Sequence, residues 1–262
     1  MKQKNINQHA VAEITLKDLE VSATLQDLEN LFKILNFLKP KIELKKLLDC
    51  GCGYGGLTMF IANQLHIKEV YGIDKADERL SEARQKGIRT FTVDIDNQKI
   101  PFPNAFFDIV TSFGAIEHLI YFDNFLAESY RVLKKDGYLI VAMPNLASYI
   151  NRIGLLFGYQ PRDVELSRYT SAQGFLPIYG GDWIGHVHSA TLRAIKSLLG
   201  AYGFSVIKVT ASNPYAKTGL IRILDKLFST TPGLSRRFII LAKKSLPHKT
   251  TVSIAESDIE PE

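Results

Sequence analysis

The sequence predicts an α/β protein built around a doubly wound parallel sheet. Three observations carry this prediction: short apolar strands alternate with helical segments, a glycine-rich turn joins the first strand to its helix, and 262 residues suffice for one large domain. The 46% hydrophobic and 23% charged residues exclude a disordered chain. We therefore expect helices on both faces of the sheet and a ligand at the carboxyl ends of its strands.

The first half of the chain shows the alternation of strands and helices most clearly. Apolar residues recur three and four positions apart between Leu25 and Leu38, which predicts an amphipathic helix that ends before Pro40. The elements predicted after it are strand 45–50, turn 51–56, helix 57–65, strand 70–74, helix 77–86, strand 90–93, strand 106–112, helix 122–133 and strand 138–143. Elements at this spacing are typical of βαβ units.

Residues 146–189 interrupt this alternation with a helical segment, 146–157, and a long loop. The aromatic residues of this region are Tyr149, Phe157, Tyr159, Tyr169, Phe175, Tyr179 and Trp183. Such a cluster suits a lid over a flat or lipid-like ligand, although a small satellite core beneath the loop would explain it as well. The alternation then resumes with helix 191–202, strand 204–210, helix 219–228 and strand 238–242.

Charge, cysteines and apolar runs indicate the cellular context. The net charge of +5 favours anionic partners only weakly; it permits peripheral contact with an anionic membrane and does not require it. Cys50 and Cys52, in a C-x-C spacing, provide neither a disulfide framework nor a complete zinc site. We see no signal-peptide pattern, no membrane-length apolar run and no module for sequence-specific nucleic-acid binding. We therefore expect a soluble, cytoplasmic protein and leave its oligomeric state open.

The turn at 51–56 carries the pattern Gly51-x-Gly53-x-x-Gly56, and Asp74 ends the next predicted strand. Glycines in a strand-to-helix turn let the backbone approach a ligand that any Cβ would push away. Asp74 could accept hydrogen bonds from two ribose hydroxyls, or it could cap the following helix. The turn alone therefore predicts a nucleotide-like ligand without identifying it.

Two acidic residues distinguish between the ligands that such a turn can bind. Asp49 lies two residues before Gly51, where a pyrophosphate gains nothing from a negative charge. A ligand with an amino group or a sulfonium could use that charge. Asp94, at the end of the third predicted strand, suits a contact with an exocyclic amine. These acids argue against a nicotinamide dinucleotide, and an NAD(P)-dependent oxidoreductase remains the alternative.

Several short motifs occur in order along residues 45–145. They are Leu48-Asp49-Cys50-Gly51-Cys52-Gly53-Tyr54-Gly55, Gly72-Ile73-Asp74, Val93-Asp94, Phe107-Asp108-Ile109-Val110, Glu117-His118-Leu119 and Leu133-Lys134-Lys135-Asp136-Gly137-Tyr138-Leu139. Each motif is common, but the ordered series resembles class I S-adenosylmethionine-dependent methyltransferases, in particular the type 11 or ubiquinone-biosynthesis-like small-molecule group. Gly56, an additional glycine, departs slightly from the pattern of that group.

The resemblance implies S-adenosylmethionine as the cofactor and a seven-stranded sheet of order 3-2-1-4-5-7-6 with strand 7 antiparallel. The residues that it assigns to the cofactor are Asp49, Gly51, Cys52, Gly53 and Gly55 at the methionine end, Asp74 at the ribose, Ile73 or Ile95 beside the adenine, and Asp94 at the adenine amino group. The resulting single domain, 1–247, would consist of an arm and helix over 1–40, a cofactor-binding half over 45–145, a helical lid insertion over 146–189 and the C-terminal half of the sheet over 190–247. We expect residues 248–262 to be a disordered acidic tail.

Residues that follow the fourth and fifth strands should face the acceptor. His118 is the first candidate for a general base, because imidazole titrates near neutrality; packing against the next helix is a slightly stronger alternative. Glu117 could pair with His118 or favour the start of that helix. His186 could face the acceptor from the edge of the lid, and Glu165 is a weaker candidate for the same cavity. Because no acidic cluster adjoins His186 and His188, we expect no metal site.

Together these features predict methyl transfer from S-adenosylmethionine to a small-molecule acceptor. A hydroxyl oxygen of a sugar, quinone, polyketide or lipid-linked compound is the favoured acceptor. An NAD(P)-dependent oxidoreductase and a non-catalytic S-adenosylmethionine-binding domain are the alternatives. Acceptor specificity would lie in residues 1–40 and 146–189, because one sheet and its lid account for the whole length.

Overall fold

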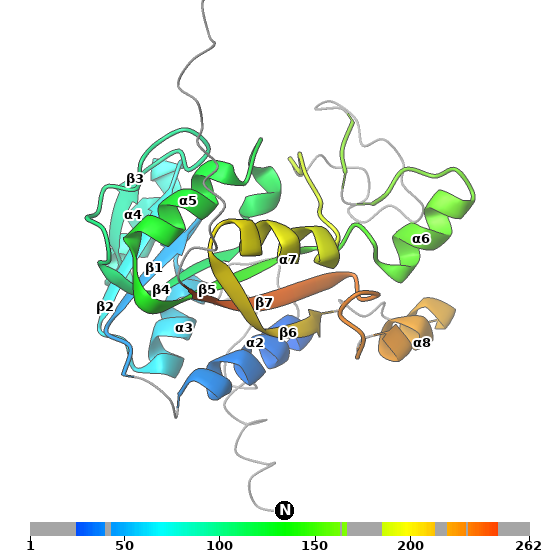
Figure 1. Cartoon of the computed structure of the whole chain (residues 1–262), viewed down its shortest axis with the longest axis horizontal. Coiled ribbons are helices and arrows are strands. Elements are labelled where there is room, and N and C mark those ends of the chain that lie inside the picture. Colours follow the sequence, from blue (N-terminus) through cyan, green and yellow to red (C-terminus); the bar gives the residue numbers. More distant parts are fainter. Residues whose placement is uncertain are drawn as a thin grey trace, which may run out of the picture.

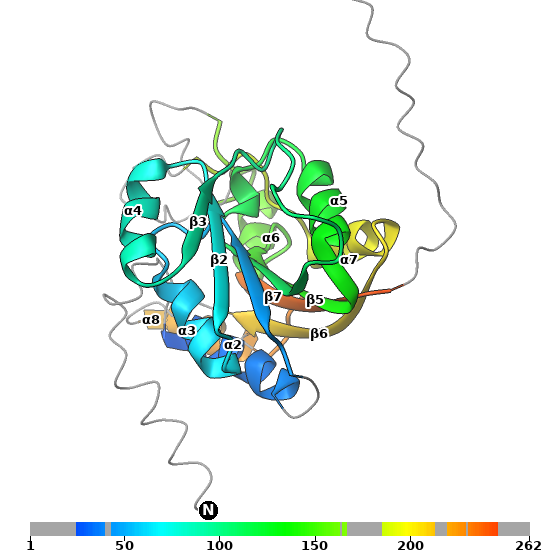
Figure 2. The same ribbon diagram turned by 90° about the vertical axis from the view of Figure 1, so that its left-hand side faces the viewer.

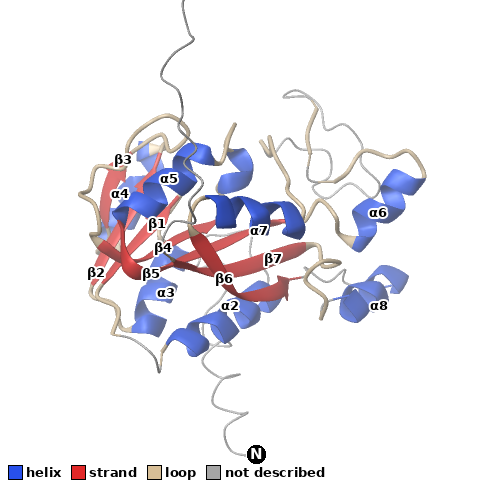
Figure 3. Cartoon of the chain, in the orientation of Figure 1, coloured by secondary structure: helices blue, strands red, loops and turns tan. Residues whose placement is uncertain are grey.

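A seven-stranded sheet forms the centre of the computed structural model (Figures 1 and 3), which describes residues 25–39, 43–162, 164–166, 185–212, 219–228 and 230–245. Its strands are β1 (Lys46–Cys50), β2 (Glu69–Asp74), β3 (Arg89–Thr92), β4 (Phe107–Phe113), β5 (Leu133–Pro144), β6 (Phe204–Ser212) and β7 (Arg237–Lys244). They are arranged in the order β3-β2-β1-β4-β5-β7-β6. Strands β1 to β5 are mutually parallel, whereas β7 runs antiparallel to β5 and β6. The predicted order and the antiparallel seventh strand are confirmed.

Helices cover both faces of the sheet. They are α2 (Leu25–Leu38), α3 (Gly56–Leu65), α4 (Asp77–Gln85), the 3₁₀ turn η1 (Ile116–His118), α5 (Asp123–Val132), α6 (Tyr149–Leu156), α7 (Leu192–Ala201) and α8 (Gly219–Phe228). Figure 2 shows α3 and α4 on one side of the sheet and α5 and α7 on the other. A separate buried apolar cluster fills each of these two layers. The arrangement is the doubly wound α/β fold that the alternation predicts.

The helix α2 shows how the apolar pattern becomes part of the core. Leu28, Leu31 and Leu35 lie on its apolar stripe and are each at most 2% exposed. They belong to the cluster that also contains residues of α3 and of the strands above it. Burial of each side chain contributes roughly 1.5–3 kcal/mol, so the helix is held mainly by this face.

The start of β5 differs from the sequence prediction. The strand begins at Leu133 rather than at Tyr138, because Leu133 pairs with Phe107 of β4 before a bulge interrupts the register. The Lys134 Nζ lies 2.7 Å from Asp108 Oδ1, which joins the same two strands by an ion pair. Residues 134–137, which lie between the predicted helix and the predicted strand, therefore belong to the longer strand β5.

The predicted lid is described over 146–162, 164–166 and 185–189. Its helix α6 begins at Tyr149, later than predicted, because Ser148 caps it: Ser148 Oγ accepts a hydrogen bond from Asn151 N at 3.4 Å. Outside the described residues lie Tyr169, Phe175, Tyr179, Trp183, residues 1–24 and the predicted acidic tail. Among the described helices, none is both long enough and apolar enough to span a bilayer.

Candidate active site

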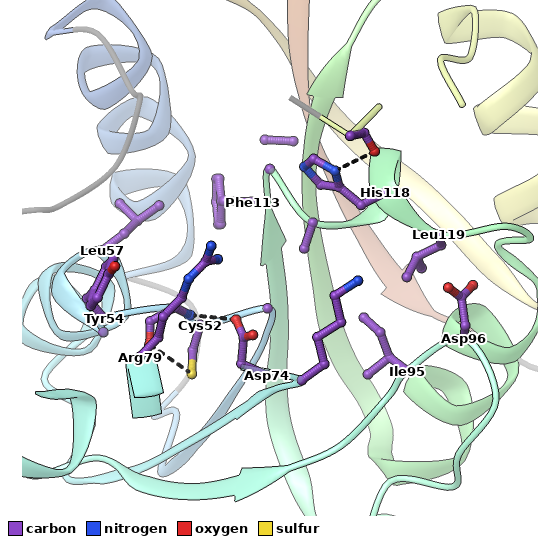
Figure 4. Close-up of a pocket in the computed structure, with 18 of the residues that line it drawn as sticks. Cys52, Tyr54, Leu57, Asp74, Arg79, Ile95, Asp96, Phe113, His118 and Leu119 are labelled. Carbon is purple, nitrogen blue, oxygen red and sulfur yellow. Dashed lines mark hydrogen bonds between the residues drawn. The ribbon is translucent and has the colours of Figure 1, made fainter. Parts of the chain in front are cut away.

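A cavity of about 740 Å³ opens at the carboxyl ends of the parallel strands (Figure 4). This is the edge at which open α/β sheets bind their ligands. We call one wall the glycine side; it consists of residues 51–55, 74 and 93–96. The opposite wall, the histidine side, consists of residues 113–115, 118, 185, 187, 212 and 237–239.

Left-handed backbone shapes the turn after β1. Gly51, Gly53 and Gly55 have φ angles of 78°, 51° and 81°, in a region that other residues rarely adopt. A Cβ on Gly51 would lie 2.3 Å from the Cβ of Ala115, whereas a Cβ on Gly53 would meet no atom within 4 Å. Gly51 thus lets the turn approach the loop after β4, and Gly53 leaves open space in the cavity wall. The additional glycine, Gly56, begins α3 and does not line the cavity.

Asp74 fixes this turn against the end of β2 and lines the cavity. Its Oδ2 accepts a hydrogen bond from Gly53 N at 3.0 Å (Figure 4), and its Oδ1 accepts one from Ala76 N at 2.9 Å. Ala76 is the residue before α4, so Asp74 also takes part in starting that helix. Each carboxylate oxygen can accept further hydrogen bonds. The side chain can therefore support the turn and still bind hydroxyl groups of a ligand.

Asp49 lies beneath the turn and does not line the cavity. It is 3% exposed, and both carboxylate oxygens are engaged: Thr58 Oγ1 donates to Oδ2 at 2.5 Å and Thr111 Oγ1 donates to Oδ1 at 2.7 Å. Burial raises the pKa of Asp49 to about 6, although the two hydroxyl hydrogen bonds act in the opposite direction. The structure thus places Asp49 as a support of the turn. Its contact with a ligand stays a prediction.

Asp94, Ile95 and Asp96 form the far end of the glycine side, after β3. The carboxylate of Asp94 accepts hydrogen bonds from Asp96 N and from Asn97 Nδ2, both at 3.1 Å. These bonds fix its orientation at the cavity wall. Ile95 is 8% exposed and offers the apolar surface beside which a flat ring can pack.

Ile73 does not line the cavity, unlike Ile95. Its carbonyl oxygen accepts hydrogen bonds from Gly51 N at 2.8 Å and from Cys52 N at 3.1 Å, so it positions the turn. Cys52 lines the cavity. Burial raises the pKa of its thiol well above the usual range, so Cys52 stays protonated and contributes apolar surface rather than a nucleophile.

His118 faces the glycine side from the opposite wall (Figure 4). Its Nδ1 lies 2.8 Å from the carbonyl oxygen of Gly185. Because a carbonyl oxygen can only accept, Nδ1 carries the hydrogen and Nε2 of the neutral ring keeps its lone pair. His118 can therefore accept a proton at Nε2, which is the geometry that a general base requires. Its role as a base stays a prediction.

Glu117 and His186 are buried behind His118 and do not line the cavity. Glu117 Oε1 lies 3.7 Å from Arg237 Nη2 and 3.9 Å from His186 Nε2. Burial raises the pKa of Glu117, and the charge of Arg237 opposes this shift. Burial, with the charges of His118 and Arg237, lowers the pKa of His186 to about 3, so its imidazole is neutral near pH 7. These two candidates can influence His118 but do not face a ligand directly.

Glu165 also lies outside the cavity wall, where it holds the end of the lid. Its Oε2 accepts hydrogen bonds from Gly185 N at 2.7 Å and His186 N at 3.1 Å. The carbonyl oxygen of Glu117 accepts hydrogen bonds from the next two backbone N–H groups, those of Val187 at 2.9 Å and His188 at 3.1 Å. Both glutamates thus position the Gly185 carbonyl that orients His118.

The sequence prediction missed the residues that the last two strands contribute. Ser212 ends β6 and Arg237 begins β7, and both line the histidine side. The Oγ of Ser212 is buried without a hydrogen-bond partner. Both residues could have been found from the predicted strand order. An antiparallel seventh strand begins at the edge of the sheet where the sixth strand ends. Leu28 and Leu31 also line the cavity, and they lie in the 1–40 segment predicted to govern specificity.

The fold is that of the Rossmann-like methyltransferases, and the cavity lies at the edge where such a sheet binds its ligand. The strand order, the glycine turn after β1 and the acids after β2 and β3 are features of these methyltransferases, and the family and fold imply S-adenosylmethionine as the cofactor. The residues present fit that molecule, since Gly53 leaves open space and Asp74 retains capacity to accept hydrogen bonds. In the described part of the chain, no group of three or more His, Cys, Asp or Glu side chains could hold a metal ion.

Comparison with known proteins shows which proteins the chain resembles. Residues 48–141 match the model of a family described as "Methyltransferase domain". It is 30% identical over 112 residues to a probable S-adenosylmethionine-dependent methyltransferase of Mycobacterium tuberculosis, covering 43% of this chain and 40% of that protein. It is 37% identical over 101 residues to the ubiquinone/menaquinone biosynthesis C-methyltransferase UbiE of Paraburkholderia phymatum, covering 37% of this chain and 42% of that protein. The predicted resemblance to class I methyltransferases is confirmed.

These matches differ in how much of each protein they cover. The chain spans about two fifths of the length of the two relatives named above. The solved structure of an S-adenosylmethionine-dependent methyltransferase of Archaeoglobus fulgidus matches a larger part of the chain, with a TM-score of 0.54 and 19% identity. That match covers 82% of this chain and 94% of the other, and it supports the fold.

Proposed function

We propose that this protein transfers a methyl group from S-adenosylmethionine to a hydroxyl oxygen of a small molecule such as a sugar, a quinone, a polyketide or a lipid-linked compound. One observation carries the proposal. A single cavity has the glycine turn and Asp74 on one wall and His118, with the Nε2 lone pair available, on the other. Such a cavity can hold a cofactor and an acceptor side by side.

The glycine side would hold the cofactor. When bound, S-adenosylmethionine supplies a methyl group that is already activated as a sulfonium. The protein then has to align donor and acceptor and exclude water. Asp74 would accept hydrogen bonds from the ribose hydroxyls, and Asp94 would accept one from the adenine amino group. The backbone of 51–55 would lie against the methionine end, above the buried Asp49.

The histidine side would hold the acceptor. His118 Nε2 would take the proton of the acceptor hydroxyl, while the Nδ1–H group stays hydrogen-bonded to the Gly185 carbonyl. A general base in this position contributes about 10²- to 10⁴-fold in rate.

Incubation with methyl-labelled S-adenosylmethionine and a panel of sugars, quinols, phenolic polyketides and lipid-linked alcohols tests the proposal. We expect a labelled methyl ether, with the methyl position assigned by NMR. A label on carbon would contradict the oxygen assignment; the relative UbiE is named a C-methyltransferase, so both products must be sought. Tight cofactor binding without transfer to any acceptor would instead favour the non-catalytic alternative.

A further inference from the structure

Two helices beyond the carboxyl edge of the sheet expose an apolar surface. The exposed apolar residues are Ile153, Leu155, Leu156 and Phe157 at α6 (37, 54, 79 and 68% exposed) and Ile223 and Leu227 on α8 (64 and 63%). We call these six residues the α6–α8 surface. Single exposed apolar side chains are common on proteins, but a group of them on neighbouring elements indicates an interaction site.

The two helices are joined by a buried polar contact. Tyr149 at the start of α6 donates a hydrogen bond from its hydroxyl to Asp225 Oδ1 of α8 at 2.6 Å, and Arg236 Nη2 donates to Asp225 Oδ2 at 2.8 Å. The rings of Tyr149 and Phe228 stack with their centroids 4.9 Å apart. Figure 1 shows α6 and α8 next to each other at one end of the molecule. The α6–α8 surface therefore has a defined support.

The exposed charges on these helices are all positive. Arg152 on α6 and Arg222 and Lys226 on α8 are exposed. The only acidic residue in the sequence of either helix is Asp225, which is 0% exposed and paired with Arg236. Basic side chains beside exposed Leu, Ile and Phe are typical of helices that lie in the interface of an anionic membrane.

The position of the helices relates this surface to the cavity. α6 follows β5 and α8 follows β6, and β7 begins at the same edge with Arg237, which lines the cavity. We propose that the α6–α8 surface docks the protein on an anionic lipid bilayer. The apolar side chains enter the interface, the three basic side chains contact lipid phosphates, and the cavity opens near the membrane. This docking does not depend on the proposed reaction.

Sedimentation with vesicles tests the docking directly. The full chain is mixed with vesicles of phosphatidylcholine and phosphatidylglycerol in equal parts, and with vesicles of phosphatidylcholine alone. We expect sedimentation with the anionic vesicles only, weakened by salt. The double variant Arg222→Glu/Lys226→Glu should bind the anionic vesicles at least about tenfold more weakly, since each basic residue near such a surface is worth about fivefold. Leu156→Ser/Leu227→Ser should also bind about tenfold more weakly, because apolar area no longer enters the interface.

Matched variants on other elements control for charge and apolarity. Arg193→Glu/Lys196→Glu makes the same charge change at exposed positions of α7, and Ile207→Ser removes an apolar side chain that is 40% exposed on β6. Neither should alter vesicle binding.

The proposal is wrong if the chain does not sediment with anionic vesicles, or if the α6–α8 variants bind as the unmodified chain does. A dimer that Leu156→Ser/Leu227→Ser dissociates in analytical ultracentrifugation would show that a second copy covers the surface instead. Methyl transfer to a water-soluble acceptor is measured without vesicles. Transfer by a chain that does not bind vesicles would contradict the docking and leave the proposed function intact.

Discussion

The two walls of the cavity are built in different ways. The glycine side comes from short stretches after three successive strands, and its groups are joined by local hydrogen bonds such as Asp74 to the backbone of Gly53 and Ala76. The histidine side combines residues from four distant parts of the chain, 113–115 with 118, 185 with 187, 212, and 237–239. Among the described residues, the Ser212 Oγ of this side and the Glu117 Oε2 and His186 Nδ1 atoms behind it are buried without hydrogen-bond partners.

This difference indicates which wall has its geometry and hydrogen bonds in place before a ligand binds. On the glycine side the backbone geometry and the carboxylates are already fixed, as expected for a site that receives one invariable molecule. Buried polar atoms without partners are costly, and a ligand that supplies the missing hydrogen bonds relieves that cost. Ser212 lines the cavity, although its Oγ is buried. We therefore assign the cofactor to the glycine side and acceptor selection to the histidine side.

The largest effect is expected at the glycine side, from Gly51→Ala. The new Cβ would lie 2.3 Å from the Cβ of Ala115, and the φ of 78° is unfavourable for alanine. The turn must move, so binding of S-adenosylhomocysteine should fall below detection by calorimetry. Methyl transfer should disappear with it.

Two further variants separate the clash from backbone strain. Gly87 also has a positive φ, of 90°, but a Cβ there would meet no atom within 4 Å. Gly87→Ala should lower stability by about 1 kcal/mol and leave cofactor binding intact. The double variant Gly51→Ala/Ala115→Gly should recover part of the binding, since it removes the clashing methyl group. Unchanged binding in Gly51→Ala would show that the turn is not the cofactor site.

The second prediction concerns the histidine side, through His118→Asn. The asparagine amide can still donate to the Gly185 carbonyl, but it lacks the basic Nε2 atom. We expect kcat to fall about 100-fold or more while the affinity for S-adenosylhomocysteine changes less than about twofold. Steady-state kinetics and calorimetry on the same preparation measure the two effects.

His188→Asn is the matched control, because His188 does not line the cavity. Its kcat should equal that of the unmodified protein. If His118→Asn kept full activity, His118 would be a packing residue, and the sequence-based alternative for it would hold.

The smallest effect is expected from the support beneath the turn, through Asp49→Asn. Burial raises the pKa of Asp49 to about 6, whereas an unfolded aspartate titrates near 3.9. Between these values the unfolded chain ionises while the folded one stays protonated, so the contribution of Asp49 to stability is lost as the pH rises. The asparagine variant lacks this loss. The free energy of unfolding of the variant, minus that of the parent, should therefore increase by on the order of 3 kcal/mol between about pH 4 and pH 6. Above pH 6 this difference should stay constant.

Urea denaturation at several pH values measures this difference. Asp77→Asn provides the control with the opposite sign, because hydrogen bonds from Arg84 and Thr92 lower the pKa of the exposed Asp77. That variant should lose stability relative to the parent as the pH rises. A pH-independent difference for Asp49→Asn would mean that burial does not raise the pKa of Asp49.

The sequence predicted the glycine side far better than the histidine side, for a physical reason. Local spacing determines a turn such as 51–55 and the position of Asp74 after a strand, so a motif can be recognised without the fold. The predicted strand order indicates the edge at which β7 begins, but only the folded chain shows that Arg237 lines the cavity. The burial of Glu117 and His186 depends on the packing of the lid against η1. Asp49 was recognised as unusual, but the threonines that engage it come from α3 and β4, and only the folded chain brings them together.

The most direct test of the central claim is calorimetric titration with S-adenosylhomocysteine and, separately, with NADH. The assignment of the glycine side predicts that the protein binds S-adenosylhomocysteine and does not bind NADH. It also predicts that Asp74→Ala weakens the binding about 100-fold, because hydrogen bonds to a carboxylate are lost, while Asp77→Ala does not. Binding of NADH without S-adenosylhomocysteine, or S-adenosylhomocysteine binding that is unaffected by Asp74→Ala, would contradict the account.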